Sequence, residues 1–244
     1  MSVVLYHFPR SLSSAAVQVI DELQADIVVR VLDFDRGQFQ STEESLRLPT
    51  GGMGLIGPVR SCPTFCDKEK GLELIQCSAI IEHLCDRFDS QHVLRPAPGT
   101  LDHARHLSLM VFAEATLFPI VQFLTPPGSP HDNTREAMRR ARFCGLAAPY
   151  LIQQLAGRPY FGGDRAAAVD FLITMPCLNN ANNAGVLEPF PELQAYFERT
   201  SARPSFARAR GDPSDAALNA ALSDMVTTAH RNGWDFEFRS TAEN

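Results

Sequence analysis

The sequence predicts an α+β protein in which a small domain, ordered βαβ and then ββα, is followed by an all-helical domain. Two observations support this prediction. Strand-like and helix-like segments alternate as far as residue 88, whereas only helical periodicity follows a Pro- and Gly-containing segment at 90–100. We therefore expect a first domain at 1–89, a linker at 90–100, a helical domain at 101–211 and a C-terminal extension with a helix at 212–244.

Composition narrows the class of protein. With 244 residues, of which 45% are hydrophobic, the chain is long and apolar enough for two ordinary domains. Its net charge is −6 without any long run of Lys or Arg, which argues against nucleic acid or an anionic membrane surface as a partner. The six cysteines are scattered, and no secretory leader or uninterrupted apolar stretch of about 18 residues is apparent. We therefore expect reduced thiols, no membrane span and a cytoplasmic location.

The first half of the small domain is predicted from a change of periodicity. Val3–Tyr6 is a short β-prone run, Ser11–Leu23 has apolar residues at helical spacing, and Asp26–Phe34 is rich in β-branched residues. A strand, a helix and a second strand in this order imply a parallel pair with a right-handed crossover.

The second half of the small domain follows a segment of poor periodicity. That segment contains a short helical pattern at Thr42–Leu48 and a Gly- and Pro-rich loop at Pro49–Gly57. Cys62–Cys66 and Leu72–Ile75 then predict a hairpin, and Cys77–Phe88 predicts an amphipathic helix.

The second domain is predicted from four apolar-periodic segments separated by Pro- and Gly-containing breaks. The expected helices cover Leu101–Leu124, Asn133–Leu155, Ala166–Ala184 and Pro191–Arg203. Pro204 is expected to close the last of these, and a final helix is expected at Ser214–Arg231 in the extension.

Four segments of the chain resemble the cytosolic glutathione transferases, in particular their serine-type and bacterial or fungal members. They read LYHFPRSLSSAAVQVIDEL at 5–23, GPVRSCP at 57–63, QCSAII at 76–81 and GRPYFGGDRAAAVDFLITMP at 157–176. With the order of elements, the resemblance covers nearly the whole chain to about residue 210. It implies a thioredoxin-like first domain, the helical second domain of this family, and glutathione as a co-substrate.

In the first segment, Ser11 lies where serine-type members place the hydroxyl that hydrogen-bonds the glutathione sulfur. A thiolate is the nucleophile, and a donor at a helix N-terminus stabilises that anion. The resemblance therefore implies that Ser11 stabilises the thiolate, with Ser13 as the alternative candidate. The competing interpretation is that Ser11, Ser13 or Ser14 only caps the helix.

In the second segment, Cys62 and Pro63 lie where the family has a hydrophobic residue followed by a cis-proline. The resemblance implies that the N–H and C=O groups of Cys62 pair with the cysteinyl part of glutathione, as an added strand would. A trans proline at a strand start is the other interpretation, and the sequence alone does not decide between the two.

In the third segment, Gln76 and Cys77 resemble the start of the family's E/Q-S-x-A-I-I signature, where a helix N-terminus holds the γ-glutamyl carboxylate. Here the serine of that signature is Cys77, which is a weaker hydrogen-bond donor. We therefore expect glutathione affinity to be lower by about 1 kcal/mol, the usual contribution of one neutral hydrogen bond.

The fourth segment supports the fold rather than the chemistry. Asp170 is the aspartate of the family's helical-domain motif, and Ala167 stands where the family has a capping Ser or Thr. Relatives often open the first helix with S-R-S-x-R, and the two arginine positions are Leu12 and Ala15 in this chain. Two cations near an anionic ligand are therefore missing.

Two further groups of residues are not interpreted as metal sites. Cys62 and Cys66 form a C-x-x-x-C pair without the usual spacing or a second ligand pair, so we expect no metal there. His103, His106 and Glu114 lie on a long helix, where we expect a solvated or interdomain face rather than ligation.

The resemblance implies a glutathione transferase that conjugates the glutathione thiolate to a small hydrophobic electrophile, with a role in detoxification and a homodimeric assembly. The alternative is a domain of the same fold that has lost catalysis and serves as a protein-interaction or scaffold module. Leu12, Ala15, Cys77 and Ala167 favour that alternative. Thiol–disulfide exchange is disfavoured, because Ser11 rather than a cysteine occupies the turn before the first helix.

Overall fold

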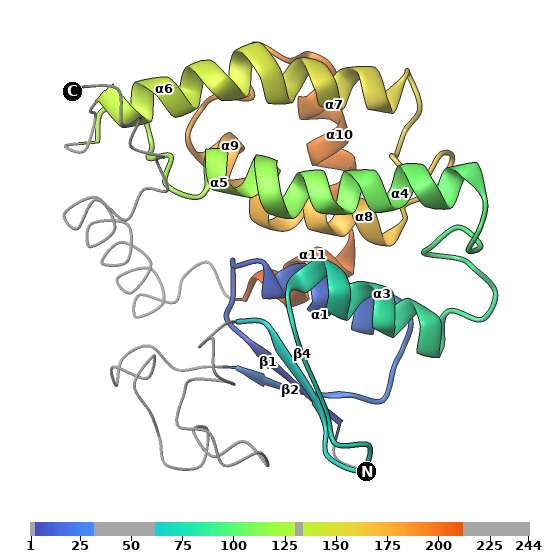
Figure 1. Cartoon of the computed structure of the whole chain (residues 1–244). Helices are drawn as coiled ribbons and strands as arrows, with labels where there is room; N and C mark the ends of the chain where they lie inside the picture. The colour runs from blue at the N-terminus through green and yellow to red at the C-terminus, as the bar shows by residue number, and fades with distance from the viewer. Residues whose placement is uncertain (1–2, 32–61, 130–133, 212–244) are drawn as a thin grey trace, which may run out of the picture.

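The computed structural model describes residues 3–31, 62–129 and 134–211, which are drawn in colour in Figure 1. The helical pattern at Thr42–Leu48, the Gly-rich loop at Pro49–Gly57 and the extension at 212–244 lie outside the described residues. The predicted architecture is confirmed: a four-stranded mixed sheet with two helices is followed by a helical domain that lies over those helices (Figure 1).

The sheet has the order β2-β1-β3-β4. β1 and β2 are parallel, as a βαβ unit requires, whereas β3 is antiparallel to both β1 and β4. Leu5 of β1 is paired with Phe65 of β3, and both side chains are completely buried. The strands cover β1 (Val3–His7), β2 (Val28–Val31), β3 (Thr64–Asp67) and β4 (Leu72–Ile75).

Helices α1 (Ser13–Glu22) and α3 (Cys77–Phe88) lie between the sheet and the helical domain (Figure 1). α1 contacts β1 and α3 on the side of its own domain, and α8 and α11 on the other. Ala15, Ala16 and Val19 of α1 have no exposed surface, and the two alanines let the neighbouring elements approach closely. α1 therefore buries apolar residues on more than one face, against both domains.

Three long helices dominate the second domain, and each contains a short π-helical segment. Their segments are α4 (Leu101–Phe112), η2 (Ala113–Leu117) and α5 (Phe118–Val121); α6 (Thr134–Arg142), η3 (Phe143–Ala147) and α7 (Ala148–Leu155); and α8 (Ala168–Leu172), η4 (Ile173–Leu178) and α9 (Asn179–Asn183).

Each π-helical segment accompanies a proline inside the helix: Pro119, Pro149 or Pro176. A proline in a helix interior has no N–H, and its ring crowds the carbonyl four residues earlier. A wider turn relieves this conflict, and the Phe118 amide accordingly bonds to the carbonyl of Ala113, five residues back. Apolar periodicity predicts the three helices but not these wider turns.

Helix Leu101–Val121 is long and apolar enough to cross a membrane by length and composition alone, criteria that a core helix of a soluble protein also meets. Met110, Ala113 and Leu117 have at most 1% exposed surface and belong to the main hydrophobic cluster of the described residues. This side of the helix therefore packs in the protein core.

The end of the helical domain differs from the prediction. α10 covers Pro191–Ser201, and Pro204 follows its end as predicted. Pro204 also begins a further helix, α11 (Pro204–Arg210), which was not predicted. Proline is well suited to the first position of a helix, where its missing N–H has no helical partner to lose. α11 returns to the first domain, where Ser205 donates to Glu22 of α1 at 2.6 Å.

Asp170 fixes the start of α8 from a completely buried position. Its carboxylate accepts hydrogen bonds from the amides of Phe161 and Ala167, each at 2.8 Å, and from the Tyr196 hydroxyl at 2.8 Å. Ala167 has no hydroxyl for the return bond, so only half of a capping box is formed. These hydrogen bonds of Asp170 all lie within the helical domain, which is consistent with the structural role predicted for Asp170.

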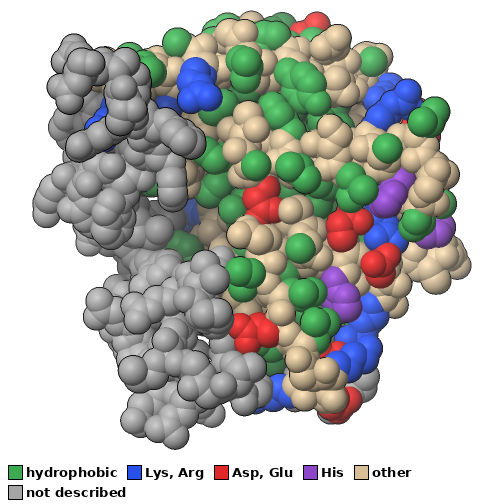
Figure 2. All heavy atoms as spheres, viewed as in Figure 1, with side chains coloured by type: hydrophobic (Ala, Val, Ile, Leu, Met, Phe, Trp, Pro, Cys, Tyr) green, Lys and Arg blue, Asp and Glu red, His purple; other side chains and the backbone are tan. Residues whose placement is uncertain are grey.

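Polar side chains gather where the two domains meet. Figure 2 shows histidine, acidic and basic side chains close together at one side of the molecule, at the level where α3 faces α4 in Figure 1. This interdomain region borders the candidate site.

Candidate functional site

The turn between β1 and α1 places Ser11 at the start of α1. The Ser11 hydroxyl donates to the carbonyl of Phe8 at 2.7 Å, and the amide of Ser13 donates to the Ser11 oxygen at 3.2 Å. Ser11 is half-buried, so part of its side chain remains accessible. A hydroxyl at this position lies where the unpaired amides of a helix start favour an anion.

Ser13 has a different environment from Ser11, because it is completely buried. Its oxygen lies 2.7 Å from the Ser11 oxygen and 2.8 Å from Nδ1 of His7, and it accepts from the amide of Phe8 at 2.9 Å. In this arrangement the Ser13 side chain has no exposed surface among the described residues. It instead connects Ser11 to His7 inside the protein.

His7 is buried at the end of β1, with 3% of its surface exposed. Burial lowers the pKa of His7 from 6.5 to about 4, and a hydrogen bond to the backbone of Ala209 opposes this shift only in part. The imidazole is therefore neutral at neutral pH. We assign its Nδ1 as the acceptor for Ser13, because the other nitrogen then donates to the Ala209 carbonyl of α11.

The peptide bond between Cys62 and Pro63 is cis, which settles the choice left open by the sequence. The Cys62 thiol lies 3.6 Å from the carbonyl oxygen of Tyr6 and contacts the Ser13 hydroxyl. Burial raises the pKa of the Cys62 thiol to about 11, despite hydrogen bonds from Ser13 and Phe8 that lower it. The thiol is therefore protonated at neutral pH, which disfavours thiol–disulfide exchange at this position.

The start of α3 meets the same corner of the molecule. Cys77 is completely buried, and its thiol donates to the carbonyl of Leu12 at 2.9 Å. Burial raises the pKa of the Cys77 thiol well above its ordinary value. Gln76 is exposed and has a φ of 73°, a region that non-glycine residues seldom adopt and that recurs at ligand sites. Because the Cys77 side chain is buried, it is the backbone of Cys77, and not its thiol, that is placed to contact a ligand.

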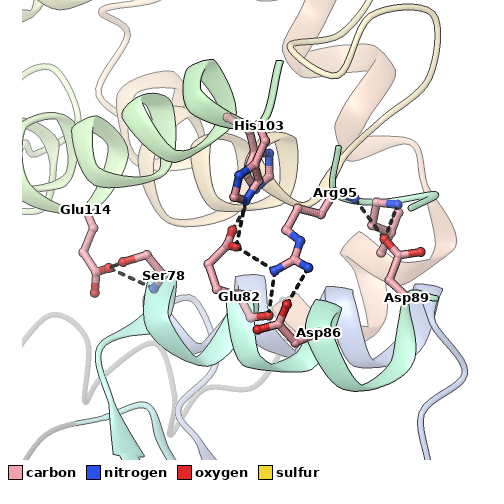
Figure 3. Close-up of polar contacts among 9 residues, drawn as sticks. Ser78, Glu82, Asp86, Asp89, Arg95, His103 and Glu114 are labelled. Carbon is pink, nitrogen blue, oxygen red and sulfur yellow. Dashed lines mark hydrogen bonds and ion pairs between the residues drawn. The ribbon is translucent and has the colours of Figure 1, made fainter. Parts of the chain in front are cut away.

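The first amides of α3 are already bonded to a carboxylate from the helical domain. Glu114 accepts from the amide of Cys77 at 2.8 Å and from the amide of Ser78 at 2.9 Å, and it also accepts from the Ser78 hydroxyl. Figure 3 shows the Glu114 side chain reaching from its helix to the start of α3. A carboxylate thus lies at an anion-binding helix N-terminus.

A second set of contacts joins α3 to the helical domain beside this point (Figure 3). Glu82 of α3 lies 3.0 Å from Nε2 of His106 and 3.0 Å from Arg95, which also pairs with Asp86. Burial acts to raise the pKa of Glu82, but hydrogen bonds from His106 and Arg95 outweigh it and lower the pKa. His106 therefore lies on the interdomain face expected from the sequence.

Comparison with known proteins gives a relative that spans nearly the whole chain. Glutathione S-transferase 3 of Schizosaccharomyces pombe is 22% identical over 243 residues, which is 93% of this chain and 94% of that protein. No protein-family model matches the chain.

Solved structures with the same fold include human glutathione-S-transferase T1-1 in its apo form, with a TM-score of 0.70, 18% identity, and coverage of 93% of this chain and 99% of that one. A glutathione transferase from Methylococcus capsulatus has a TM-score of 0.68, 22% identity, and coverage of 90% and 98%. A sphingomonad glutathione S-transferase, solved in complex with glutathione, has a TM-score of 0.65, 23% identity, and coverage of 89% and 98%. The chain therefore has the fold of the glutathione transferases.

In this fold, the three predicted segments of the candidate site lie together. Cys62 contacts Ser13, the first residue of α1, and the Cys77 thiol bonds to the carbonyl of Leu12, the residue before it. Ser11 is the accessible hydroxyl of this corner, and Ser13 is its buried neighbour. The roles of Ser11, Ser13, Cys62, Pro63, Gln76 and Cys77 in binding or catalysis stay predictions.

Sequence reasoning did not assign His7 or Glu114 to this candidate site, although it placed Glu114 on a solvated or interdomain face. His7 could have been noticed as a histidine directly after a β-prone run and before the turn with the serines. Glu114 is an isolated acid within the apolar run MVFAEATLF, and a lone acid in a core helix usually has a specific partner. Neither signal identifies the partner, because that partner is distant in the sequence.

Proposed function

We propose that the protein is a glutathione transferase that conjugates the glutathione thiolate to a small hydrophobic electrophile. The observation that carries this proposal is the half-buried Ser11 hydroxyl at the start of α1, in the same corner as the Cys62–Pro63 segment and the start of α3. The relative and the structural neighbours that are named glutathione transferases support it.

In the proposed reaction, the Ser11 hydroxyl turns from the Phe8 carbonyl to the glutathione sulfur and donates to it. The amide of Ser13 continues to donate to the Ser11 oxygen, which strengthens the hydroxyl as a donor. This stabilises the thiolate and lowers the thiol pKa, so that the thiol releases its proton to solvent. The thiolate then attacks the electrophilic carbon, a carbon–sulfur bond forms, and the leaving group departs with its electron pair.

Two measurements on the full-length protein test this proposal. Calorimetry with glutathione should show saturable binding, and chlorodinitrobenzene should be converted to the glutathione adduct with release of chloride. Absence of binding heat at millimolar glutathione, together with absence of turnover, would contradict the proposal. That result would favour the scaffold alternative.

We also propose a homodimeric assembly. Large apolar side chains remain exposed on the helical domain, among them Val111 of α4 at 59%, Met138 of α6 at 52% and Leu146 of η3 at 52%. Figure 2 shows apolar side chains spread over this domain, on the side where α4 lies at the front. Sedimentation velocity should show a dimer that Val111→Asp weakens, whereas a monomer at all concentrations would contradict the proposal.

A further inference from the structure

We propose that Glu114 is a built-in competitor for the γ-glutamyl carboxylate of glutathione, so that the tripeptide binds completely only after Glu114 has left the start of α3. This inference rests on the proposed function, because it concerns the same site. It assigns to the helical domain a direct influence on the affinity of the first domain for its ligand.

The contacts of Glu114 resemble those that a ligand carboxylate would make. Two amides at the start of α3, those of Cys77 and Ser78, and the Ser78 hydroxyl all donate to its carboxylate oxygens. The first amides of a helix have no partner within the helix, and Gln76 provides no side-chain cap here. A second carboxylate cannot use the same donors at the same time, and it would also meet a like charge.

The fold holds the Glu114 backbone close to α3. Glu114 lies within η2, where an extra residue in the turn changes the direction of the side chains that follow. The contacts of Glu82 with His106 and Arg95 fix α3 against the start of α4 and the linker nearby. The Glu114 carboxylate therefore belongs to a helix whose position against α3 is fixed by other contacts.

The Glu114 side chain can nevertheless leave without a backbone change. It is half-buried, and rotation about the three side-chain bonds of glutamate moves its carboxylate off the start of α3. Exchange of one carboxylate for another keeps the hydrogen bonds of the helix start, so the competition is reversible. Removal of the competitor should therefore raise affinity roughly 10- to 100-fold, the range for one or two hydrogen bonds to a charged group.

The sign of this effect separates the proposal from two other roles. If Glu114 instead bound the ammonium group of glutathione, removal of its charge would weaken binding. If Glu114 only capped α3, its removal would lower stability and leave the affinity unchanged or lower.

The first experiment measures glutathione binding by calorimetry for the full-length wild type, Glu114→Ala, Glu114→Gln and Asp102→Asn. Asp102 is the matched control because it is an exposed acid on the same long helix, paired with Arg105. We expect the dissociation constant to fall roughly 10- to 100-fold in Glu114→Ala, less in Glu114→Gln, and not at all in Asp102→Asn. Unchanged or weaker binding in both Glu114 variants would overturn the proposal.

The second experiment does not depend on glutathione. Thermal unfolding is measured in sodium sulfate and in sodium chloride of equal ionic strength. In Glu114→Ala the vacated amides should take up sulfate, so sulfate should raise the Tm of this variant more than that of the wild type or Asp102→Asn. An equal response in all proteins would overturn the proposal, because the helix start would then hold no exchangeable anion.

The two readouts together separate this proposal from the proposed function. If the wild type binds glutathione and the Glu114 variants bind it no more tightly, only the competitor role fails. If sulfate stabilises Glu114→Ala selectively but no protein binds glutathione, the proposed function fails and the competitor role fails with it, while the exchangeable anion at the start of α3 is confirmed.

Discussion

The starts of α1 and α3 lie in the same corner of the molecule, but the polar groups at each helix start find their hydrogen-bond partners in different ways. At α1, the Ser11 and Ser13 hydroxyls bond to each other and to Phe8 and His7, all within six residues, although Ser13 also contacts Cys62. At α3, the capping carboxylate belongs to Glu114, 37 residues after Cys77 and in the other domain. The hydrogen bonds at the start of α1 are thus mainly local, whereas those at the start of α3 depend on how the two domains pack.

This difference has a consequence for ligand binding. Both helix starts favour an anion, because their first amides point out of the helix. The start of α1 retains an accessible hydroxyl, while the start of α3 already holds a carboxylate. We therefore expect substitutions at α1 to affect mainly the chemical step, and substitutions at α3 to affect mainly affinity.

The largest effect is expected at the start of α1. Ser11→Ala should lower kcat/KM for conjugation by roughly 10²- to 10³-fold, because it removes the donor to the thiolate. Ser14→Ala is the matched control, since the buried Ser14 hydroxyl has no hydrogen-bond partner among the described residues. Steady-state kinetics with chlorodinitrobenzene measure both. Equal rates for the wild type and Ser11→Ala would remove Ser11 from the role.

A smaller effect, on stability rather than on the rate of conjugation, is expected from His7, the buried histidine that supports the same turn. Because burial lowers the pKa of His7 from 6.5 to about 4, its contribution to stability is complete above pH 6.5 and is lost as the pH falls towards 4. The loss amounts to about 3 kcal/mol over this interval, from the size of the pKa shift.

The variant His7→Asn tests this pH dependence, because it removes the titrating group and keeps an acceptor towards Ser13. The free energy of unfolding, measured with urea across this pH range, should fall less steeply in the variant. The difference between the two proteins should therefore shrink as the pH falls. Parallel curves would show that His7 is not buried as a neutral group.

The smallest effect is expected at the start of α3, from restoring the serine of the family signature. The sequence alone attributes weaker glutathione binding to the Cys77 side chain. In the structure that side chain is buried and donates to the carbonyl of Leu12, so Cys77→Ser should change affinity by less than about 1 kcal/mol. A tenfold gain in glutathione affinity, measured by calorimetry, would instead show that the side chain of residue 77 contacts the ligand.

The elements of the fold could be predicted wherever a local pattern decides them. Cys77–Phe88 coincides with α3, and the expected hairpin strand Leu72–Ile75 coincides with β4. Both segments combine a clear periodicity with clear boundaries. The candidate segment at Ser11 came instead from a resemblance to the glutathione transferases, and the role of Ser11 stays a prediction.

The features that could not be predicted depend on contacts between distant residues. The π-helical turn next to Pro119 and the extra helix after Pro204 involve prolines, which a reading of periodicity treats only as breaks. The bond from Glu114 to the start of α3 requires the relative position of two domains. The buried state of His7 likewise depends on α11, more than 190 residues later, which packs against it through Ala209.

The central claim is that Ser11 stabilises the thiolate of bound glutathione, and the ultraviolet absorbance of that thiolate tests it most directly. The absorbance of glutathione bound to the wild type, Ser11→Ala and Ser14→Ala is followed as a function of pH. We predict a titration midpoint below that of free glutathione in the wild type and Ser14→Ala, and a return towards the free value in Ser11→Ala. A midpoint in Ser11→Ala equal to that of the wild type would contradict the account.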